Sequence, residues 1–179
     1  QDEHRIYING VILISAVLNF GTNDYNVGND LPRALYIPSY TAAAWYHKKL
    51  APALLARPLA DVLKESEQWA IGPYATALIK GGWMSEAEKS AIAEKMAYYT
   101  GLSKELCLQA NLRVEENRFY KALRRSDGLS VGRLDARFTG RNLDDAGEYV
   151  DFDPSFANID GPFTATINDY LSKELKFTE

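Results

Sequence analysis

A short, almost wholly apolar run extends from Val11 to Leu18, and only Ser15 interrupts it. Valine, isoleucine and leucine dominate this leading segment (residues 11–18), which predicts a strand buried on both faces, as in a parallel sheet. It is far too short to span a bilayer, which takes about 20 apolar residues. Because the rest of the sequence offers almost no partner strands, we expect the segment to belong to a sheet that lies mostly outside this chain.

Polar turn residues fill positions 19–32, and helical periodicity dominates after them. Pro38 and Ser39 predict the start of a helix over residues 40–50, with Ser39 as its N-cap. This helix is rich in alanine and threonine. We therefore expect another element to approach it closely.

A longer helical region is predicted to begin at Pro58, which suits the first turn of a helix. Apolar residues recur after it at helical spacing. Gly72 and Pro73 predict a kink or a break near the middle. Gly81 predicts the end of the region.

The clearest local signal is a capping box formed by Ser85 and Glu88. The helix that it opens is expected to end near Gly101. Ser103 is then expected to cap a short helix that extends through Leu108.

Patterns are weaker in the last third of the chain. We expect a helix over residues 113–125, short extended pieces within residues 129–138 and an acidic loop over residues 142–154. A final helix is expected over residues 162–175. The predicted fold class is therefore mainly α, with one leading strand.

Composition narrows the range of functions only slightly. The 179 residues are 46% apolar and 25% charged, as in an ordinary globular domain, and the formal net charge of −4 gives no reason to expect nucleic acid or an anionic membrane as a partner. Cys107 is the only cysteine, which fits a cytosolic chain and equally a bacterial secreted one. The chain starts with QDEHRIYING and continues directly into the leading segment, which indicates a piece of a longer protein.

A Gly-x-Ser-x-Gly pattern occurs at residues 128–132, as in the nucleophile elbow of α/β-hydrolases. Such an elbow lies between a strand and a helix, and its histidine follows the serine in the chain. Here a predicted helix and a turn precede Ser130, and both histidines, His4 and His47, come before it. We therefore expect that Ser130 is not a nucleophile and that the chain carries no catalytic residues.

No metal site or cofactor is predicted. His47 has no second histidine or cysteine nearby, which favours a surface or core histidine over a metal ligand. Asp151 and Asp153 match only part of a calcium-binding loop, since Phe156 stands where an EF-hand requires glycine. Glycine-rich phosphate loops, His-Glu-x-x-His and paired cysteines are also absent from the sequence.

Two charged stretches have structural interpretations. Basic and aromatic residues mix over residues 118–125, which in an acidic chain favours an amphipathic helix with one charged face over an RNA-binding helix. Arg133, Asp135 and Arg137 would face one way in an extended segment. We expect them to hold this segment to the helices; binding of a substrate carboxylate by the arginines is the alternative.

Five segments resemble the bacterial branch of the serine carboxypeptidase family, which belongs to the α/β-hydrolases. These segments extend over nearly the whole chain: NGVILISAVLNF (9–20), GNDLPRALYIPSYTAAAWYHKKL (28–50), RPLADVLKESEQWA (57–70), SVGRLDARFTGRN (130–142) and DPSFANIDGPFTATINDYL (153–171).

The resemblance implies that the nucleophilic serine precedes residues 11–18 and that the catalytic Asp and His follow residues 162–175, so none of the triad has a matching position here. Residues 1–18 would form the strand and approach segment of the hydrolase core, and residues 19–179 the helical cap domain. Such a cap gates and shapes the peptide-binding pocket and helps to exclude water. The chain would be catalytically incomplete alone, and its parent would be periplasmic or secreted.

Peptide substrate would then be the partner, and five residues are candidates for the pocket wall: Asn19, Phe20, Tyr36, Tyr40 and Trp45. The loop over residues 19–32 follows the C-terminal end of a sheet strand, where α/β folds bind their ligands. Plain packing of the cap on the core is the alternative role for each of the five.

A self-contained helical interaction module without a catalytic parent is the alternative function. Such a module would bury residues 11–18 within its own helices. Without sheet neighbours, this segment has apolar faces and free edges that favour aggregation. We therefore expect self-association through this segment, or its refolding as a helix against the cap.

Overall fold

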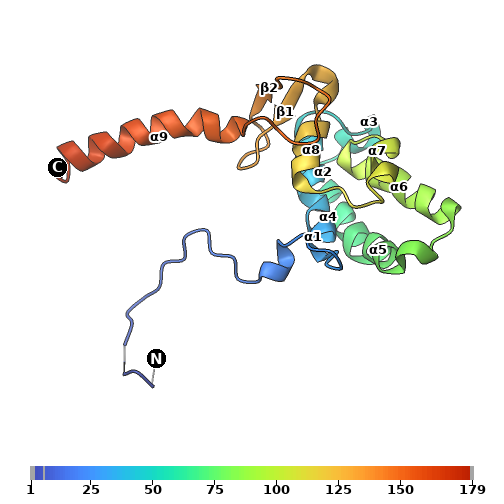
Figure 1. The fold of residues 1–179 in the computed structure, drawn as a ribbon, viewed down its shortest axis with the longest axis horizontal. Helices are drawn as coiled ribbons and strands as arrows, with labels where there is room; N and C mark the ends of the chain where they lie inside the picture. The colour runs from blue at the N-terminus through green and yellow to red at the C-terminus, as the bar shows by residue number, and fades with distance from the viewer. Residues whose placement is uncertain (1–2, 6, 178–179) are drawn as a thin grey trace.

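A computed structural model describes residues 3–5 and 7–177 of the chain. The protein is mainly helical, with one small antiparallel sheet (Figure 1). The elements in chain order are a 3₁₀ turn, η1 (Phe20–Thr22), then α1 (Leu31–Leu35), α2 (Ile37–Tyr46), α3 (Pro52–Leu55), α4 (Leu59–Trp69), α5 (Ala75–Lys80), α6 (Glu86–Thr100), α7 (Lys104–Gln109), α8 (Glu116–Ala122), β1 (Leu129–Val131), β2 (Thr139–Arg141) and α9 (Pro154–Lys173).

Helix α2 packs against both α4 and α6, and its small residues allow this close approach. Thr41 and Ala44 are completely buried. A side chain at Gly101, just after α6, would lie 3.2 Å from Cβ of Ala44 and 3.0 Å from the carbonyl oxygen of Lys49. The expectation of a closely approached helix is therefore confirmed.

The boundaries of α2 differ from the predicted range of 40–50. Pro38 lies in the first turn, and the helix begins at Ile37 with no side-chain cap, so the prediction of Ser39 as N-cap is wrong. A proline fits there because the first helical N–H groups need no partner within the helix. The helix ends before Lys48, whose φ is 58°.

Other local signals are confirmed. Ser85 and Glu88 form both hydrogen bonds of the capping box at the start of α6, and Gly101 ends that helix with a left-handed φ of 70°. The Ser103 side chain caps α7. Gly72 and Pro73 lie in a short π-helical turn, Ala70–Tyr74, that separates α4 from α5.

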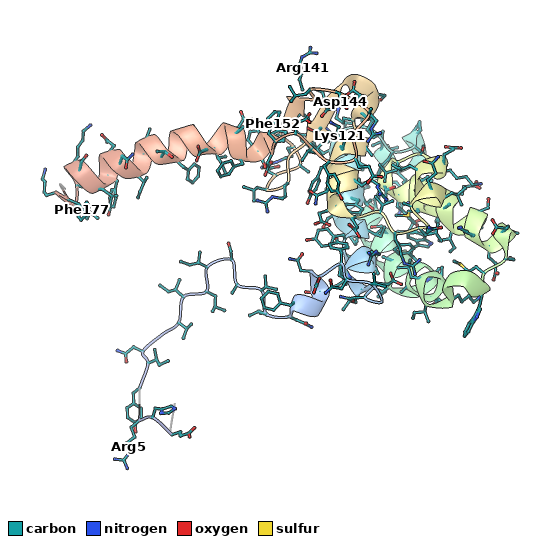
Figure 2. The ribbon with its side chains drawn as sticks, viewed as in Figure 1. Arg5, Lys121, Arg141, Asp144, Phe152 and Phe177 are labelled. Atoms are coloured by element: carbon teal, nitrogen blue, oxygen red, sulfur yellow. The ribbon has the colours of Figure 1, made fainter. Side chains whose placement is uncertain are left out.

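Lys121 attaches the acidic loop to the helical body. Its side chain is fully buried, and its ammonium group donates to the carbonyl oxygen of Asp144 at 2.7 Å and to the carboxylate of Asp151 at 3.4 Å. Figure 2 shows Lys121 and Asp144 together, close to the start of α9. The prediction of a single charged face on α8 is therefore wrong at Lys121, because a loop supplies oxygen ligands on the buried side.

The leading segment forms neither a strand nor a helix. Residues 11–18 are irregular and exposed; Ile12, Ile14 and Leu18 each expose more than 80% of their surface. The prediction of a strand is therefore wrong for this chain by itself, because its only described strands, β1 and β2, pair with each other. Refolding as a helix against the body does not occur. Self-association through the segment stays a prediction.

Helix α9 begins at Pro154 rather than at residue 162, because Asp153 caps it by accepting a hydrogen bond from the backbone N–H of Ser155. Pro162 lies inside the helix. Beyond its first turn, α9 extends away from the body, and Phe163 remains 70% exposed (Figure 1). The leading segment and α9 leave the body on the same side. Within the described ranges, no helix is long and apolar enough to cross a membrane.

Removal of residues 1–18 should leave the stability of the body unchanged, because the described part of this stretch is exposed. We expect the free energy of unfolding to change by no more than about 0.5 kcal/mol, measured by urea denaturation with near-UV circular dichroism. A large loss of stability would mean that the segment packs against the helices in solution.

Lys121→Ala should destabilise the protein by about 1–3 kcal/mol, because it removes both hydrogen bonds to the acidic loop and leaves a cavity beside Asp144. Lys64→Ala is the control, since Lys64 is exposed. Equal urea midpoints for the two variants would contradict a structural role for Lys121.

Candidate functional site

Four tyrosines gather where the first turns of the body meet α8. We call Tyr25, Tyr36, Tyr40 and Tyr120 the tyrosine cluster. The ring centroids of Tyr25 and Tyr36 are 5.9 Å apart, and those of Tyr36 and Tyr40 are 6.0 Å apart. Tyr40 stacks on Phe119 of α8 at 4.1 Å, and Phe119 contacts Tyr120 edge to face at 6.4 Å. Aromatic contacts thus connect the N-terminal loop to α8.

Glu116, in the first turn of α8, supplies the negative charge of the cluster. Burial is the largest cause of the raised pKa of Tyr25 and Tyr36, and the charge of Glu116 is the next largest. Burial, the neighbouring tyrosines and Glu116 raise the pKa of Tyr40 and Tyr120 as well. All four hydroxyls therefore stay protonated at neutral pH.

Two arginines hold the N-terminal loop in place beside this cluster. Arg33 is buried and binds Glu115 at 2.9 Å and the carbonyl oxygen of Asn29 at 2.6 Å. Arg113 makes two hydrogen bonds to Asp30, at 2.7 and 2.8 Å. The two ion pairs join α1 and the end of the loop before it to the segment that leads into α8. They therefore fix the position of Tyr25 relative to Glu116.

A second candidate is an apolar groove of about 380 Å³ beside α2, which we call the tryptophan groove. Trp45 and Tyr46 line it from α2, and Ala136 and Arg137 line it from the loop between β1 and β2. The indole Nε1 of Trp45 is buried without a hydrogen-bond partner among the described residues. His47 fixes the loop, because its Nε2 lies 2.6 Å from the carbonyl oxygen of Ala136 and must donate to it.

The charged residues of this loop form two separate pairs. Arg137 binds Asp135 within the loop, at 2.6 Å. Arg133 lies 3.7 Å from Asp153, the capping residue of α9. The expected attachment of the loop to a helix is therefore confirmed for Arg133. It is wrong for Arg137, whose side chain binds Asp135, two residues earlier in the same loop.

The structure brings together only some of the residues predicted to line a pocket. Tyr36 and Tyr40 join the tyrosine cluster, although Tyr40 is 98% buried in the core, with 2% of its surface exposed. Asn19 caps η1, which contains the exposed Phe20, and η1 packs beside α1. Trp45 lies apart, in the tryptophan groove. Substrate binding by these five residues stays a prediction.

Tyr25 and Glu116 were missed as site residues. Tyr36 and Tyr40 are four residues apart, a spacing that places side chains on one helix face. No comparable periodicity links Tyr25 or Glu116 to them. Their proximity depends on the long-range pairs Arg33–Glu115 and Arg113–Asp30.

The motifs considered for catalysis or metal binding have structural surroundings in the part of the chain that the structure describes. Ser130 is buried in β1 and its hydroxyl makes no hydrogen bond to a histidine. Asp151 binds Lys121, and Asp153 caps α9. Among the described residues, no group of three or more histidine, cysteine, aspartate or glutamate side chains could hold a metal ion.

Comparison of the chain with protein-family models, with curated proteins and with solved structures found no significant match.

Protonation of His47 should destabilise the protein in mild acid, because the charged ring is partly buried. Burial lowers the pKa of His47 below its usual value of 6.5, and the positive charges of Arg124 and Lys49 add to this shift, although the bond to Ala136 opposes it. The unfolded chain therefore takes up a proton first as the pH falls. Stability should decrease as the pH falls below about 6.5, in proportion to this shift.

Urea denaturation between pH 7.5 and 5 measures this effect. His47→Gln should flatten the pH dependence, and His4→Gln, at an exposed position, should not change it. A pH dependence that survives in His47→Gln would assign the effect to other groups.

Proposed function

We propose that this chain is the helical cap of a serine carboxypeptidase-like hydrolase and that it gates and shapes the peptide-binding pocket of that enzyme. The catalytic serine, aspartate and histidine would come from other parts of the parent protein. The family resemblance of the five segments supports this proposal. The exposed apolar surface at both ends of the chain supports it independently.

The observation that carries most weight is that both ends of the chain leave the body on one side and expose large apolar side chains. The leading segment and α9 project from the same side of the body (Figure 1). Large side chains remain exposed on both, including Ile12 and Ile14 on one and Phe163, Ile167 and Tyr170 on the other. A domain inserted into another leaves and re-enters its host at neighbouring points. An α/β core would cover both surfaces, which water otherwise contacts at a cost of about 25 cal/mol per Å².

The tyrosine cluster connects these two ends. Tyr25 follows η1 closely in the chain, and the hydroxyl of Tyr36 donates to Oδ1 of Asn23, the residue directly after η1, at 2.9 Å. At the other side, the charges of Arg133 and Asp153 act on Tyr120, and Asp153 caps α9. In the proposed arrangement the cluster therefore lies near the junction of cap and core, where a cap meets substrate.

A self-contained interaction module has less support. It would have to bury the leading segment within its own helices, and residues 11–18 are exposed instead. The body forms a core from α2, α4, α6 and α8 without that segment. The packing partner of the leading segment would therefore lie outside this body.

The isolated chain should not react with a fluorophosphonate probe, because Ser130 lacks a histidine partner and is buried. The full-length parent protein should react with the probe and should release the last residue from a blocked dipeptide with a free C-terminus. Mass spectrometry of the labelled proteins and an amino-acid assay measure the two outcomes.

The coding sequence on both sides of this chain gives a further check. It should contain a Gly-x-Ser-x-Gly elbow upstream and an aspartate followed by a histidine downstream. Labelling of Ser130 in the isolated chain, or flanks without the triad, would contradict the proposal.

A further inference from the structure

Large apolar side chains are exposed where α5 leads into α6. Trp83, in the short 3₁₀ turn Gly81–Trp83, exposes 92% of its surface, and Ile79, near the end of α5, exposes 82%. Contact with water is unfavourable for such side chains, at a cost of about 25 cal/mol per Å². Apolar side chains that are exposed close together are typical of a surface that binds a partner.

An apolar groove of about 210 Å³ lies next to these side chains, and we call it the α5–α6 groove. Its apolar walls come from the α5 side, from the turn and from α6: Pro73, Ala77, Met84, Ala91 and Ile92. Met84 directly follows Trp83 in the chain, so the exposed tryptophan stands at the edge of the groove. Met84 and Ile92 also pack against the buried core. The groove is therefore a fixed feature of the body.

The α5–α6 groove has room for an indole. A closed cavity of about 150 Å³ holds a benzene molecule, and an indole adds one five-membered ring to a benzene ring. The indole of Trp83 does not occupy the groove of its own chain, because almost all of its surface is exposed. One face of the body thus carries a large apolar side chain beside a groove that is large enough to receive it.

The charges at the rim of the groove balance each other. Lys80 and Glu88 both line it and bind each other at 3.0 Å, and about half of each side chain is exposed. Such a rim gives no preference for a ligand of either charge. It is complementary to itself, since a second copy related by a two-fold axis can place its glutamate opposite this lysine and its lysine opposite this glutamate. The charges therefore favour a second copy of the chain as the partner.

This face lies on the opposite side of the body from the two ends of the chain. Figure 1 shows α5 on one side of the body, whereas the leading segment and α9 extend from the other. A hydrolase core attached to those ends would leave the α5–α6 groove uncovered. Association through the groove is therefore compatible with the proposed function and does not depend on it.

We propose that this face binds the same face of a second copy in a dimer with two-fold symmetry. Trp83 of each copy occupies the α5–α6 groove of the other, and Ile79 packs beside the indole. Because the same two surfaces meet in both directions, the contact is closed and assembly stops at the dimer. Few large side chains take part, so the interface belongs to the small end of specific interfaces. We expect a dissociation constant on the order of 10 µM.

Sedimentation velocity of the chain from about 1 to 300 µM, a range on both sides of this constant, tests the inference. We expect monomers at the low end of the range and dimers at the high end. Trp83→Ala should weaken dimerisation at least tenfold, since a tryptophan buried at the centre of an interface is a typical hot spot. Leu143→Ala is the matched control, because Leu143 is 89% exposed but lies between β2 and α9.

A second variant tests the groove itself. Ala91 lines the groove and is exposed, so Ala91→Glu places a charge in the path of the indole without disturbing the core. It should also weaken dimerisation at least tenfold, because the charge would be buried in an apolar contact. Both variants should keep the urea midpoint of the unchanged chain at about 1 µM, where monomers dominate. Ile12→Ser controls for association through the leading segment and should leave the dissociation constant unchanged.

A chain that stays monomeric over the whole range would leave this face to another partner and would overturn the inference. A dimer that keeps its affinity in Trp83→Ala or in Ala91→Glu would overturn it as well. Loss of the dimer in Ile12→Ser would do the same, because it would assign the contact to the leading segment. Assemblies larger than a dimer that depend on Trp83 would show an open head-to-tail contact and would contradict the two-fold arrangement.

Discussion

The close packing of α2 against α4 and α6 is the constraint on which the rest of the structure depends. Thr41 and Ala44 leave so little side-chain volume that the chain after α6 reaches the end of α2 at Gly101. Tyr40, one turn before Ala44, stacks on Phe119 and so places α8. The tyrosine cluster lies on one side of α2, and the tryptophan groove also lies beside α2. A larger residue at Ala44 would separate the helices that position both.

Local structure could be predicted from the sequence where a few neighbouring residues determine it. The Ser85–Glu88 capping box, the Gly101 stop and the interruption at Gly72 and Pro73 all depend on contacts within a few positions. The leading segment is different, because a buried strand is stable only with partner strands. The early start of α9 does not follow from the interpretation of Asp153 as part of an acidic loop, although aspartate is also a strong N-cap.

The candidate site could be predicted only in part, for a similar reason. Tyr36 and Tyr40 are near neighbours in the chain, and their association follows from helical spacing. The position of Glu116 beside Tyr25 instead requires ion pairs between residues more than 80 positions apart, such as Arg33 and Glu115. Periodicity contains no information on such pairs. A buried lysine such as Lys121 was likewise unexpected, because lysine is almost never fully buried unless it is paired.

Helix α9 is attached to the body at one end only. With 20 residues it is about 30 Å long, and Figure 2 shows Phe177 at the far tip. The attached end is tied to the loop between β1 and β2 through hydrogen bonds from the backbone N–H groups of Arg133 and Leu134 to Asp153 and Ser155. The helix can therefore rotate as a rigid rod about its attached end, where these bonds lie. A rotation of about 10° there would move the tip by about 5 Å, so small displacements at one end become large ones at the other.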